Sequence, residues 1–517
     1  MVTTDPSPAE DRARSSGPAD RPGAASSAGL AALEARLRTD LALLELPKKP
    51  WAAPRTADGQ PVLPVVIVGA GMAGLTAAAA LRFAGIDAPL FDRAPDGFEG
   101  PWATTARMET LRSPKTLTGP CLGQPSLTFR AWYEARFGTE AWAALGLIPR
   151  LMWMDYLRWY RRVLALDVRN DHNVLQVVPG ADAAAPVRLV IAGPDGERTV
   201  LARRVVIATG RDGLGAAWLP PYAAAIPPAL RAHSSDLLDF AKLRGLRVGV
   251  VGAGASAMDV AATALEAGAA SVDLLIRRPD LPRINKVKGA GNPGFVHGYH
   301  RLPDDWKWRI RRYLARIQTP PPRGSTLRVS RHPNARFHLG CTIEQVTIEP
   351  VTVEPVTVSA GDRAAPLQVA TNRGRFALDF LFFSTGFQLD WARRPEFASF
   401  AGAVLAWRDR FTPPPGEADQ EMLDSPYLGP GFEFQEKLPG AAPGLSRIHC
   451  FCYPATLSHG TVTGDIPAIS EGAERLAVAL AAHLYCEDAA AHFAAIQAYD
   501  DPELLGDEWT PAPGPPG

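Results

Sequence analysis

The feature that most constrains the fold is a repeated pattern, in which an apolar strand runs into a glycine-rich turn and then a helix. It occurs at residues 65–74, as VVIVGAGMAG, and again at 247–257, as RVGVVGAGASA. Each copy is followed later in the chain by an apolar strand that ends in glycine, RRVVIATG at Gly210 and LDFLFFSTGF with Gly386. This order predicts an α/β fold built from two Rossmann-like dinucleotide-binding domains.

The first glycine loop has the residues expected of a pyrophosphate site. Gly69, Gly71 and Gly74 open a helix, and the next strand, APLFDR, ends in Asp92 and Arg93. Glycines let the backbone approach the pyrophosphate, which then lies at the positive N-terminus of the helix, and the carboxylate can hold ribose hydroxyls. The alternative is an ordinary glycine turn in a parallel α/β protein.

The second loop differs from the first at the end of its second strand. Its loop residues are Gly252, Gly254, Ser256 and Ala257. The following strand ends in Arg277 and Arg278, where the first copy has Asp92. A guanidinium can bind a 2′-phosphate bidentately, whereas a carboxylate would repel it. The pattern therefore favours NADPH over NADH, with a solvated basic surface as the alternative. A nicotinamide site beside a second dinucleotide site with an acidic ribose contact indicates hydride transfer into a bound FAD.

Composition excludes several other classes of protein. The 54 basic and 54 acidic residues cancel, which gives no electrostatic reason to expect nucleic acid or an anionic membrane as a partner. No apolar run reaches the ~18 residues needed to span a bilayer. The five cysteines show neither a zinc-ligand spacing nor the close pair of a disulfide reductase, so we expect no metal and a reducing cytoplasmic location.

The order of the motifs predicts a discontinuous first domain with the second inserted into it. We expect the following organisation: a disordered tail and an amphipathic helix at 1–60, the first part of the FAD domain at 61–213, the NADPH domain at 214–384, the second part of the FAD domain at 385–490, and a C-terminal tail at 491–517. The five-residue repeat at 346–358 contains two prolines, which favour the edge of a sheet.

Taken together, these motifs resemble the single-chain flavin monooxygenases, the group of flavin-containing, N-hydroxylating and Baeyer–Villiger enzymes. The segments GAGMAG…FDR, GPW, LRSPK, ATG, VVGAGASAMD and STGF occur in the order that this group shows, over residues 62 to 490. The resemblance implies an enzyme that reduces FAD with NADPH, retains NADP⁺ and forms a C4a-(hydro)peroxyflavin. That species passes one atom of O₂ to a small organic substrate.

The resemblance also implies roles for individual residues. Trp102 in GPW would lie beside the flavin, as would the Gly464–Asp465 pair, and Thr209 in ATG and Thr385 in STGF would contact the cofactors. Three residues are candidates for catalysis, namely Arg112 in LRSPK, His233 at the position of the signature histidine of the group, and His459 in SHGTVTGD.

Two departures from the group leave the reaction subtype open. The phenylalanine and glycine of the monooxygenase signature are replaced by Pro227 and Ala229. Arg112 stands where flavin-containing monooxygenases have asparagine, and it could stabilise an anion or form a structural ion pair. Oxygenation at nitrogen or sulfur is slightly favoured over Baeyer–Villiger insertion.

Two alternatives remain at this stage. A flavin reductase or electron-transfer enzyme would use the same two nucleotide modules, and a non-catalytic flavoprotein would retain only the fold. The sequence names neither the substrate nor the oligomeric state.

Overall fold

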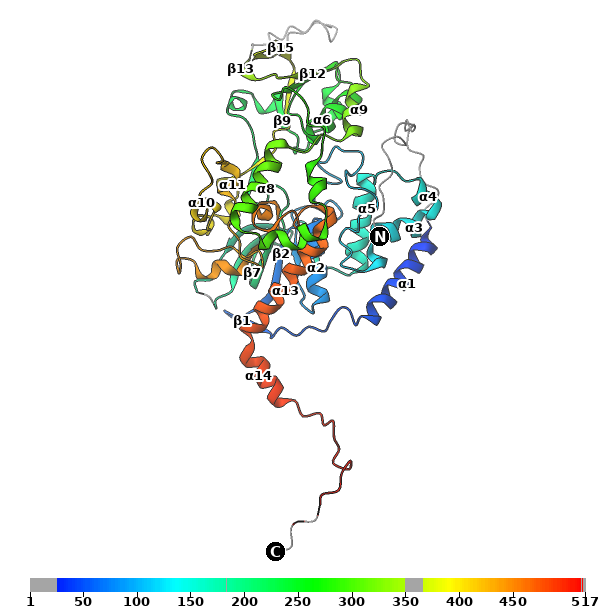
Figure 1. Cartoon of the computed structure of the whole chain (residues 1–517), viewed down its shortest axis with the longest axis vertical. Helices are drawn as coiled ribbons and strands as arrows, with labels where there is room; N and C mark the ends of the chain where they lie inside the picture. The colour runs from blue at the N-terminus through cyan, green and yellow to red at the C-terminus, as the bar shows by residue number, and fades with distance from the viewer. Residues whose placement is uncertain (1–25, 183, 349–365, 513, 515–517) are drawn as a thin grey trace.

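The computed structural model describes residues 26–182, 184–348, 366–512 and 514, and it places them in two sheet-containing bodies (Figure 1). The first body, drawn blue, cyan and orange, occupies the lower half of the view, and the second, drawn mainly green, occupies the top. Long helices run between the two. The predicted α/β fold with two Rossmann-like domains is confirmed.

The larger sheet of the described chain has eight strands and a mainly parallel core in the order β4-β3-β2-β7, which β6 and β5 extend in antiparallel fashion. Its strands are β1 (Arg55–Ala57), β2 (Gln60–Val68), β3 (Leu90–Phe91), β4 (Val168–Arg169), β5 (Asn173–Val178), β6 (Val187–Gly193), β7 (Gly196–Ile207) and β18 (Ile448–Cys450). The late strand β18 pairs in parallel with β7. The chain therefore returns to its first sheet after completing the second one.

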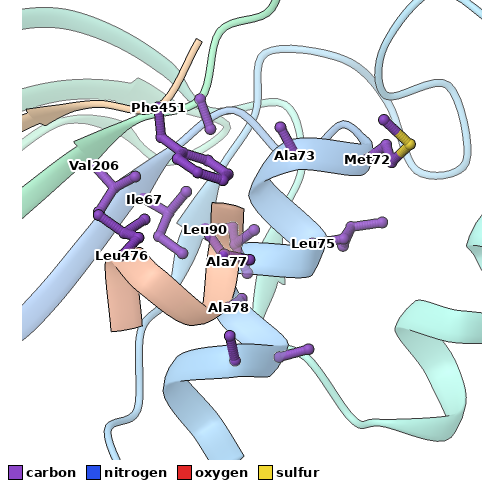
Figure 2. Packing of buried hydrophobic residues seen from close by; sticks show 14 of the residues in the cluster. Ile67, Met72, Ala73, Leu75, Ala77, Ala78, Leu90, Val206, Phe451 and Leu476 are labelled. Atoms are coloured by element: carbon purple, nitrogen blue, oxygen red, sulfur yellow. The ribbon is translucent and has the colours of Figure 1, made fainter. Parts of the chain in front are cut away.

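The second half of β2 reads as a continuous apolar run because side chains on both of its faces are buried, with Val65 to Val68 each at most 7% exposed. Helix α2 (Met72–Phe83) contacts β2 and packs along the long late helix α13 (Ile469–Glu487), whose Leu476 lies near Ile67 and Val206 of the sheet (Figure 2). Ala77 and Ala78 of α2 are buried in the same core as Leu476 of α13. Their small side chains allow the close approach of helix to helix and helix to strand, so the glycine loop rests on a rigid base.

The second sheet is parallel throughout, in the order β12-β11-β10-β16-β9. Its strands are β9 (Arg231–His233), β10 (Arg247–Val251), β11 (Ser271–Ile276), β12 (Ala335–Leu339) and β16 (Phe380–Phe383). A small antiparallel sheet of β13 (Ile343–Ile348), β14 (Leu367–Thr371) and β15 (Gly374–Leu378) adjoins it, and β8 (Gly215–Ala217) pairs with β17 (Phe387–Leu389). Helices α6 (Ala255–Glu266) and α9 (Arg323–Ser330) pack together beside this sheet.

Helix α8 (Asp304–Ile317) joins the second body to the first, since Trp308 packs on Trp407 from the late part of the chain. The remaining helices are α3 (Phe129–Phe137), α4 (Thr139–Ala144), α5 (Arg150–Val163), α7 (Pro293–Gly298), α10 (Trp407–Arg410), α11 (Gln420–Asp424) and α12 (Thr456–His459). Among the described helices, none is both long and apolar enough to cross a bilayer.

The ends of the described chain behave differently from each other. Helix α1 (Ser27–Leu43) buries Leu33 and Leu37, as its amphipathic pattern predicts. Helix α14 (Ala489–Ala498) buries none of its described residues and projects from the molecule at the bottom of the view (Figure 1). Most of the predicted disordered tail and of the proline-containing repeat lies outside the described residues. The domain bounds given above stay a prediction.

Candidate functional site

The first glycine loop leaves no room for side chains at two of its three glycines. Gly69 has φ +100°, and a Cβ there would lie 2.7 Å from the carbonyl oxygen of Ala208. A Cβ on Gly74 would lie 2.0 Å from the carbonyl oxygen of Gly69. Only glycine allows this positive φ without strain and this closeness of helix to strand. The loop is therefore a tightly folded turn that aims its backbone past the end of β2.

The N-terminus of α2 is arranged to receive an anion. Gly71 is its N-cap, and in the described chain no side chain caps this helix end. The carboxylate of Asp92 accepts hydrogen bonds from the N–H groups of Ala70 at 2.7 Å and Ala94 at 2.8 Å. It therefore fixes the loop, while its remaining lone pairs can still accept ribose hydroxyls. Uncapped N–H groups beside a ribose acceptor fit the dinucleotide FAD.

The predicted flavin-side residues adjoin this loop. Gly100 of the GPW segment lies against it, because a Cβ built on Gly71 would be 3.8 Å from the Cα of Gly100. Trp102 is half-buried, and its carbonyl oxygen accepts a hydrogen bond from Arg150. Arg93 is exposed beside Asp92, and the hydroxyl of Thr209 donates to the carbonyl of Gly213 at 3.1 Å.

The second loop is more open than the first. Gly252 has φ +137°, and a Cβ there would lie 2.6 Å from the carbonyl of Ser384, whereas nothing lies within 4 Å of a Cβ on Gly254. Gly254 is the N-cap of α6, again without a side-chain cap in the described chain. Ser256 is exposed in the first turn and Ala257 is fully buried. An open, uncapped helix end fits the pyrophosphate of a second dinucleotide.

The two arginines after β11 have different surroundings. Arg277 is exposed at the end of the strand. Arg278 donates a hydrogen bond to the carbonyl oxygen of Arg316 on α8 at 2.7 Å. Arg277 is therefore the better candidate for binding a 2′-phosphate. Arg278 instead links the end of β11 to α8 through its hydrogen bond. Thr385, in the strand-end motif next to this loop, donates its hydroxyl to the carbonyl of Trp218.

A group of charged side chains from both bodies interact electrostatically with one another. Arg112, Arg211 and Asp465 are all solvent-accessible yet surrounded by protein on most sides. This crowding raises the pKa of the Asp465 carboxyl, against the lowering effects of Thr461 and of nearby arginines. It also lowers the pKa of Arg112, which the buried Asp259 of α6 partly opposes. Arg112 thus lies in a shared electrostatic field with residues from both bodies.

The three predicted catalytic residues lie in different environments. His233 ends β9, shares a hydrogen bond between Nδ1 and the Ser235 hydroxyl at 2.7 Å, and packs against the Phe387 ring at 5.4 Å. Burial lowers the pKa of its imidazole. This position at the junction of the bodies supports a domain-linking role. Arg112 is by contrast exposed and lies within the electrostatic influence of Asp465.

His459 is fully enclosed by the first body. Its Nε2 bonds to the carbonyl of Gly429 at 3.0 Å, its Nδ1 to Arg475 at 3.2 Å, and its ring stacks on Phe432 at 4.0 Å. Burial lowers the pKa of this ring well below the ordinary value. A neutral imidazole with both nitrogens engaged is suited to positioning rather than to proton transfer. Its catalytic role stays a prediction, and the geometry favours a structural one.

A cavity of about 90 Å³ lies beside Arg211 of this charged group. Residues that line it include Arg211, Arg311, Phe387, Gln388, Glu421 and Tyr453. The guanidinium of Arg211 lies 4.3 Å from the centre of the Tyr453 ring. Crowding by protein raises the pKa of Glu421, against the lowering charge of Arg211. Flat aromatic faces together with guanidinium, amide and carboxyl groups suit a small, planar, polar ligand.

The sequence analysis missed these cavity residues because they come from distant segments. Arg211 follows the glycine of the ATG motif directly, so its place beside the cofactor end of β7 could have been inferred. Arg311 on α8 and Glu421 on α11 carry no local signal, since only the folded chain brings them together.

A comparison with curated proteins gives a match over nearly the whole chain. The FAD-dependent urate hydroxylase of Xanthomonas campestris pv. campestris is 38% identical over 485 residues, which cover 93% of this chain and 98% of that protein. The chain belongs to the FAD-dependent monooxygenases. As a flavin monooxygenase, it is an oxidoreductase that binds FAD and a nicotinamide dinucleotide and transfers oxygen to a small substrate. The expected function and cofactors are thus confirmed. The alternatives of a flavin reductase or electron-transfer enzyme and of a non-catalytic flavoprotein are not supported.

Matches to parts of the chain agree with this membership. The model of the L-lysine 6-monooxygenase/L-ornithine 5-monooxygenase family matches residues 138–322, and that of an NAD(P)-binding Rossmann-like domain matches 67–114. Among solved structures, the reduced ornithine hydroxylase of Pseudomonas aeruginosa has a TM-score of 0.61 at 17% identity, covering 82% of this chain and all of that chain. L-lysine 6-monooxygenase from Pseudomonas syringae has a TM-score of 0.58 at 16% identity, covering 82% of this chain and 99% of that one. These structures share the fold of the monooxygenase.

Proposed function

We propose that this monooxygenase hydroxylates urate or a closely similar anionic oxopurine. The observation that carries the proposal is the 38% identity to a urate hydroxylase over nearly the full length of both chains. The sequence favours oxygenation of the substrate at nitrogen or sulfur, whereas this proposal places the hydroxyl group on a carbon of the purine. One atom of O₂ enters the purine, the other leaves as water, and a nicotinamide dinucleotide supplies the two electrons.

The chemistry of the cavity supports such a substrate. Urate is planar, carries negative charge at neutral pH, and presents alternating C=O and N–H groups along its edges. Arg211, Arg311 and the Gln388 amide can donate to its oxygens, and Glu421 can accept from an N–H group. Tyr453 and Phe387 offer flat faces for the rings. Asp212 and Asp419 also line the cavity and can accept from further N–H groups of the purine.

The bound cofactors and this chain would divide the work. FAD supplies the oxygen-activating chemistry when it is bound. The Gly69 loop and Asp92 would hold FAD, and the Gly254 end of α6 with Arg277 would hold NADPH. Arg112 and Asp465 would then set the charge beside the flavin, and Arg211 would orient the purine. We also infer a cytoplasmic location from the cysteine usage.

The proposal is tested by incubating the FAD-loaded enzyme with NADPH and urate and following NADPH oxidation, urate consumption and hydrogen peroxide release. We expect urate to be consumed in equal amount to NADPH, with little peroxide. Arg211→Ala should lower kcat/KM for urate by about ten-fold or more, because a charge-assisted hydrogen bond is lost. Arg309→Ala is the matched control on α8, where Arg309 lies over Trp306 outside the cavity, and it should retain full activity.

Other outcomes would overturn the assignment. Coupled hydroxylation of ornithine or lysine, with urate left unchanged, would place this chain with the amine hydroxylases. Equal loss of activity in the Arg211→Ala and Arg309→Ala variants would show that Arg211 has no special role in binding the substrate in this cavity.

A further inference from the structure

The last described stretch of the chain carries apolar side chains that no other part of the structure covers. Residues 489–512, which we call the C-terminal arm, comprise helix α14 and the segment after it, and all of them except His492 are exposed. The large apolar side chains of the arm are 55% to 78% exposed, namely Phe493, Ile496, Tyr499, Leu504, Leu505 and Trp509. A helix as short as α14 is marginal in water by itself, and a large exposed apolar patch marks an interaction site. The arm therefore has the character of a segment that packs on a surface outside its own chain.

The base of the arm is held in one direction. The ring of His492 stacks on that of Tyr485 of α13 at 4.3 Å and lies 5.9 Å from the ring of Trp51. Asp488, which directly precedes α14, is 3% exposed and pairs with Arg55 at 2.6 Å. A segment whose direction is fixed in advance loses less entropy when it docks.

The arm is also acidic. It contains five carboxylates and no lysine or arginine. The hydrogen bonds that the described structure gives to these carboxylates stay within the arm, since Asp501 accepts from the Tyr499 hydroxyl at 3.4 Å and Glu508 from the N–H of Leu505 at 2.7 Å. Apolar side chains together with negative charge fit a surface that is apolar and basic.

One exposed face of helix α8 has this opposite character. Trp306, Arg309, Tyr313 and Arg316, which we call the α8 face, follow one another at spacings of three and four residues and so lie on one side of the helix. Trp306 and Tyr313 are 47% and 46% exposed, and the guanidinium of Arg309 lies 5.1 Å from the centre of the Trp306 ring. Both arginines are exposed, and neither forms an ion pair with a carboxylate of the described chain.

The α8 face is separate from the active-site cavity and from the arm of its own chain. Arg311 and Ala315 line the cavity, and at 3.6 residues per turn they lie on the opposite side of α8 from Tyr313. Helix α14 projects from the bottom of the view in Figure 1, whereas α8 lies at the middle of the molecule. The arm therefore does not cover the α8 face of its own chain.

We propose that two copies of the enzyme form a dimer by exchanging their C-terminal arms, so that the arm of each copy docks on the α8 face of the other. The apolar side chains of α14 would pack on Trp306 and Tyr313, and the acidic residues after α14 would pair with Arg309 and Arg316. A second copy is the partner because the same chain carries both complementary surfaces, and a reciprocal exchange closes the assembly at two copies. A stable interface takes roughly 20–30 residues from each partner, and residues 489–512 alone come close to this requirement.

The test is the mass of the FAD-loaded, full-length enzyme in solution, measured by sedimentation velocity. Protein concentrations from about 1 to 100 µM cover the weak end of the affinities that interfaces of standard size give. We expect twice the mass of one chain, with dissociation favoured as the salt rises from about 0.1 to about 1 M, because salt screens exposed charges. Phe493→Ala removes apolar contact while keeping a good helix former, and Arg316→Glu sets like charges against each other. Each variant should weaken the dimer at least about ten-fold.

Leu438→Ala and Arg36→Glu are the matched controls. Leu438 is 67% exposed in the segment before β18, and Arg36 pairs with Asp40 on the surface of α1. Both should stay dimeric, and all four variants should oxidise NADPH at the unchanged rate per chain, because each copy keeps its own cofactor loops and cavity.

Three results would overturn the proposal. The first is an unchanged enzyme with the mass of one chain at every concentration. The second is a dimer that Phe493→Ala weakens and Arg316→Glu does not, which would place the arm on another surface. The third is a single-chain enzyme that co-sediments with phosphatidylcholine vesicles through Phe493, which would assign the arm to a lipid surface.

Discussion

The two glycine loops of this monooxygenase share a motif but differ in how closely they are packed. In the first, the third glycine touches the loop itself, since a Cβ on Gly74 would lie 2.0 Å from the carbonyl of Gly69. In the second, the same position is Ala257, whose methyl group is fully buried without disturbing α6. The difference indicates that α2 lies closer to β2 than α6 lies to β10. The motif alone, read as glycine spacing, does not reveal this.

The residues that end the second strand of each module also differ in how firmly they are held. Asp92 is held by two backbone N–H groups of its own module, so the first site is rigid before any cofactor binds. Arg277 is exposed and reaches outward. A preorganised site loses less entropy on binding than an exposed one. The contrast fits a flavin that stays bound and a nicotinamide dinucleotide that exchanges in each turnover.

The largest effect should come from exchanging the third loop residue in each module. Gly74→Ala forces a methyl group into the Gly69 carbonyl, and overpacking of this kind costs about 1–3 kcal/mol. We expect the purified variant to retain about ten-fold less FAD, measured by flavin absorbance per protein. The converse change, Ala257→Gly, adds only the ~1 kcal/mol cost of glycine in a helix and should leave the KM for NADPH within about two-fold. Equal FAD content in the Gly74→Ala variant would show that the two loops are equally tolerant.

How far the sequence predicts this molecule depends on whether the signal is local. The glycine loops, the strands that end at Gly210 and Gly386, and the return of the chain to its first sheet all follow from local pattern and chain order. The cavity does not, because Arg211, Arg311 and Glu421 come from separate elements that meet only after folding. The motif predicts a site role for His459, yet the bonds of its two ring nitrogens depend on Arg475 and Gly429, which no local pattern places beside it.

A smaller effect should distinguish the two arginines at the second site. Arg277→Ala removes the exposed guanidinium, and loss of a charge-assisted contact to a 2′-phosphate should raise the KM for NADPH by about ten-fold, with the KM for NADH unchanged. Arg278→Ala is the control, because Arg278 bonds to the Arg316 carbonyl, and it should affect both cofactors equally. If Arg277→Ala raised both values of KM by the same factor, the assignment of the phosphate to Arg277 would be wrong.

The smallest effect concerns a contact that joins the two bodies. His300, in the segment between α7 and α8, accepts from Arg475 of α13 at 2.7 Å, and Arg475 also bonds to His459. Burial, with the charges of Arg475, Arg301, Lys307 and His297, lowers the pKa of His300 to about 4. The junction is therefore made of one cation and two neutral rings, and it requires His300 to be unprotonated.

This requirement predicts a dependence of stability on pH. An unfolded histidine has a pKa near ~6.5, so between about 4 and 6.5 the unfolded chain binds more protons than the folded one. The free energy of unfolding should then fall as the pH drops from 6.5 towards 4.

His300→Gln should reduce this fall by less than about 1 kcal/mol, because solvent screens the partly exposed ring. The measurement is urea unfolding at pH 7 and pH 5, with His332→Gln as the control, since His332 follows α9 in the second body and is not among the groups that act on His300. Other histidines with a lowered pKa, such as His449 and His459, contribute to the pH dependence of the free energy of unfolding in every variant. The test is therefore the difference in this pH dependence between the two variants. An identical slope in both would mean that the Arg475 junction tolerates a charged His300, and that the two bodies are joined chiefly by other contacts such as the packing of Trp308 on Trp407.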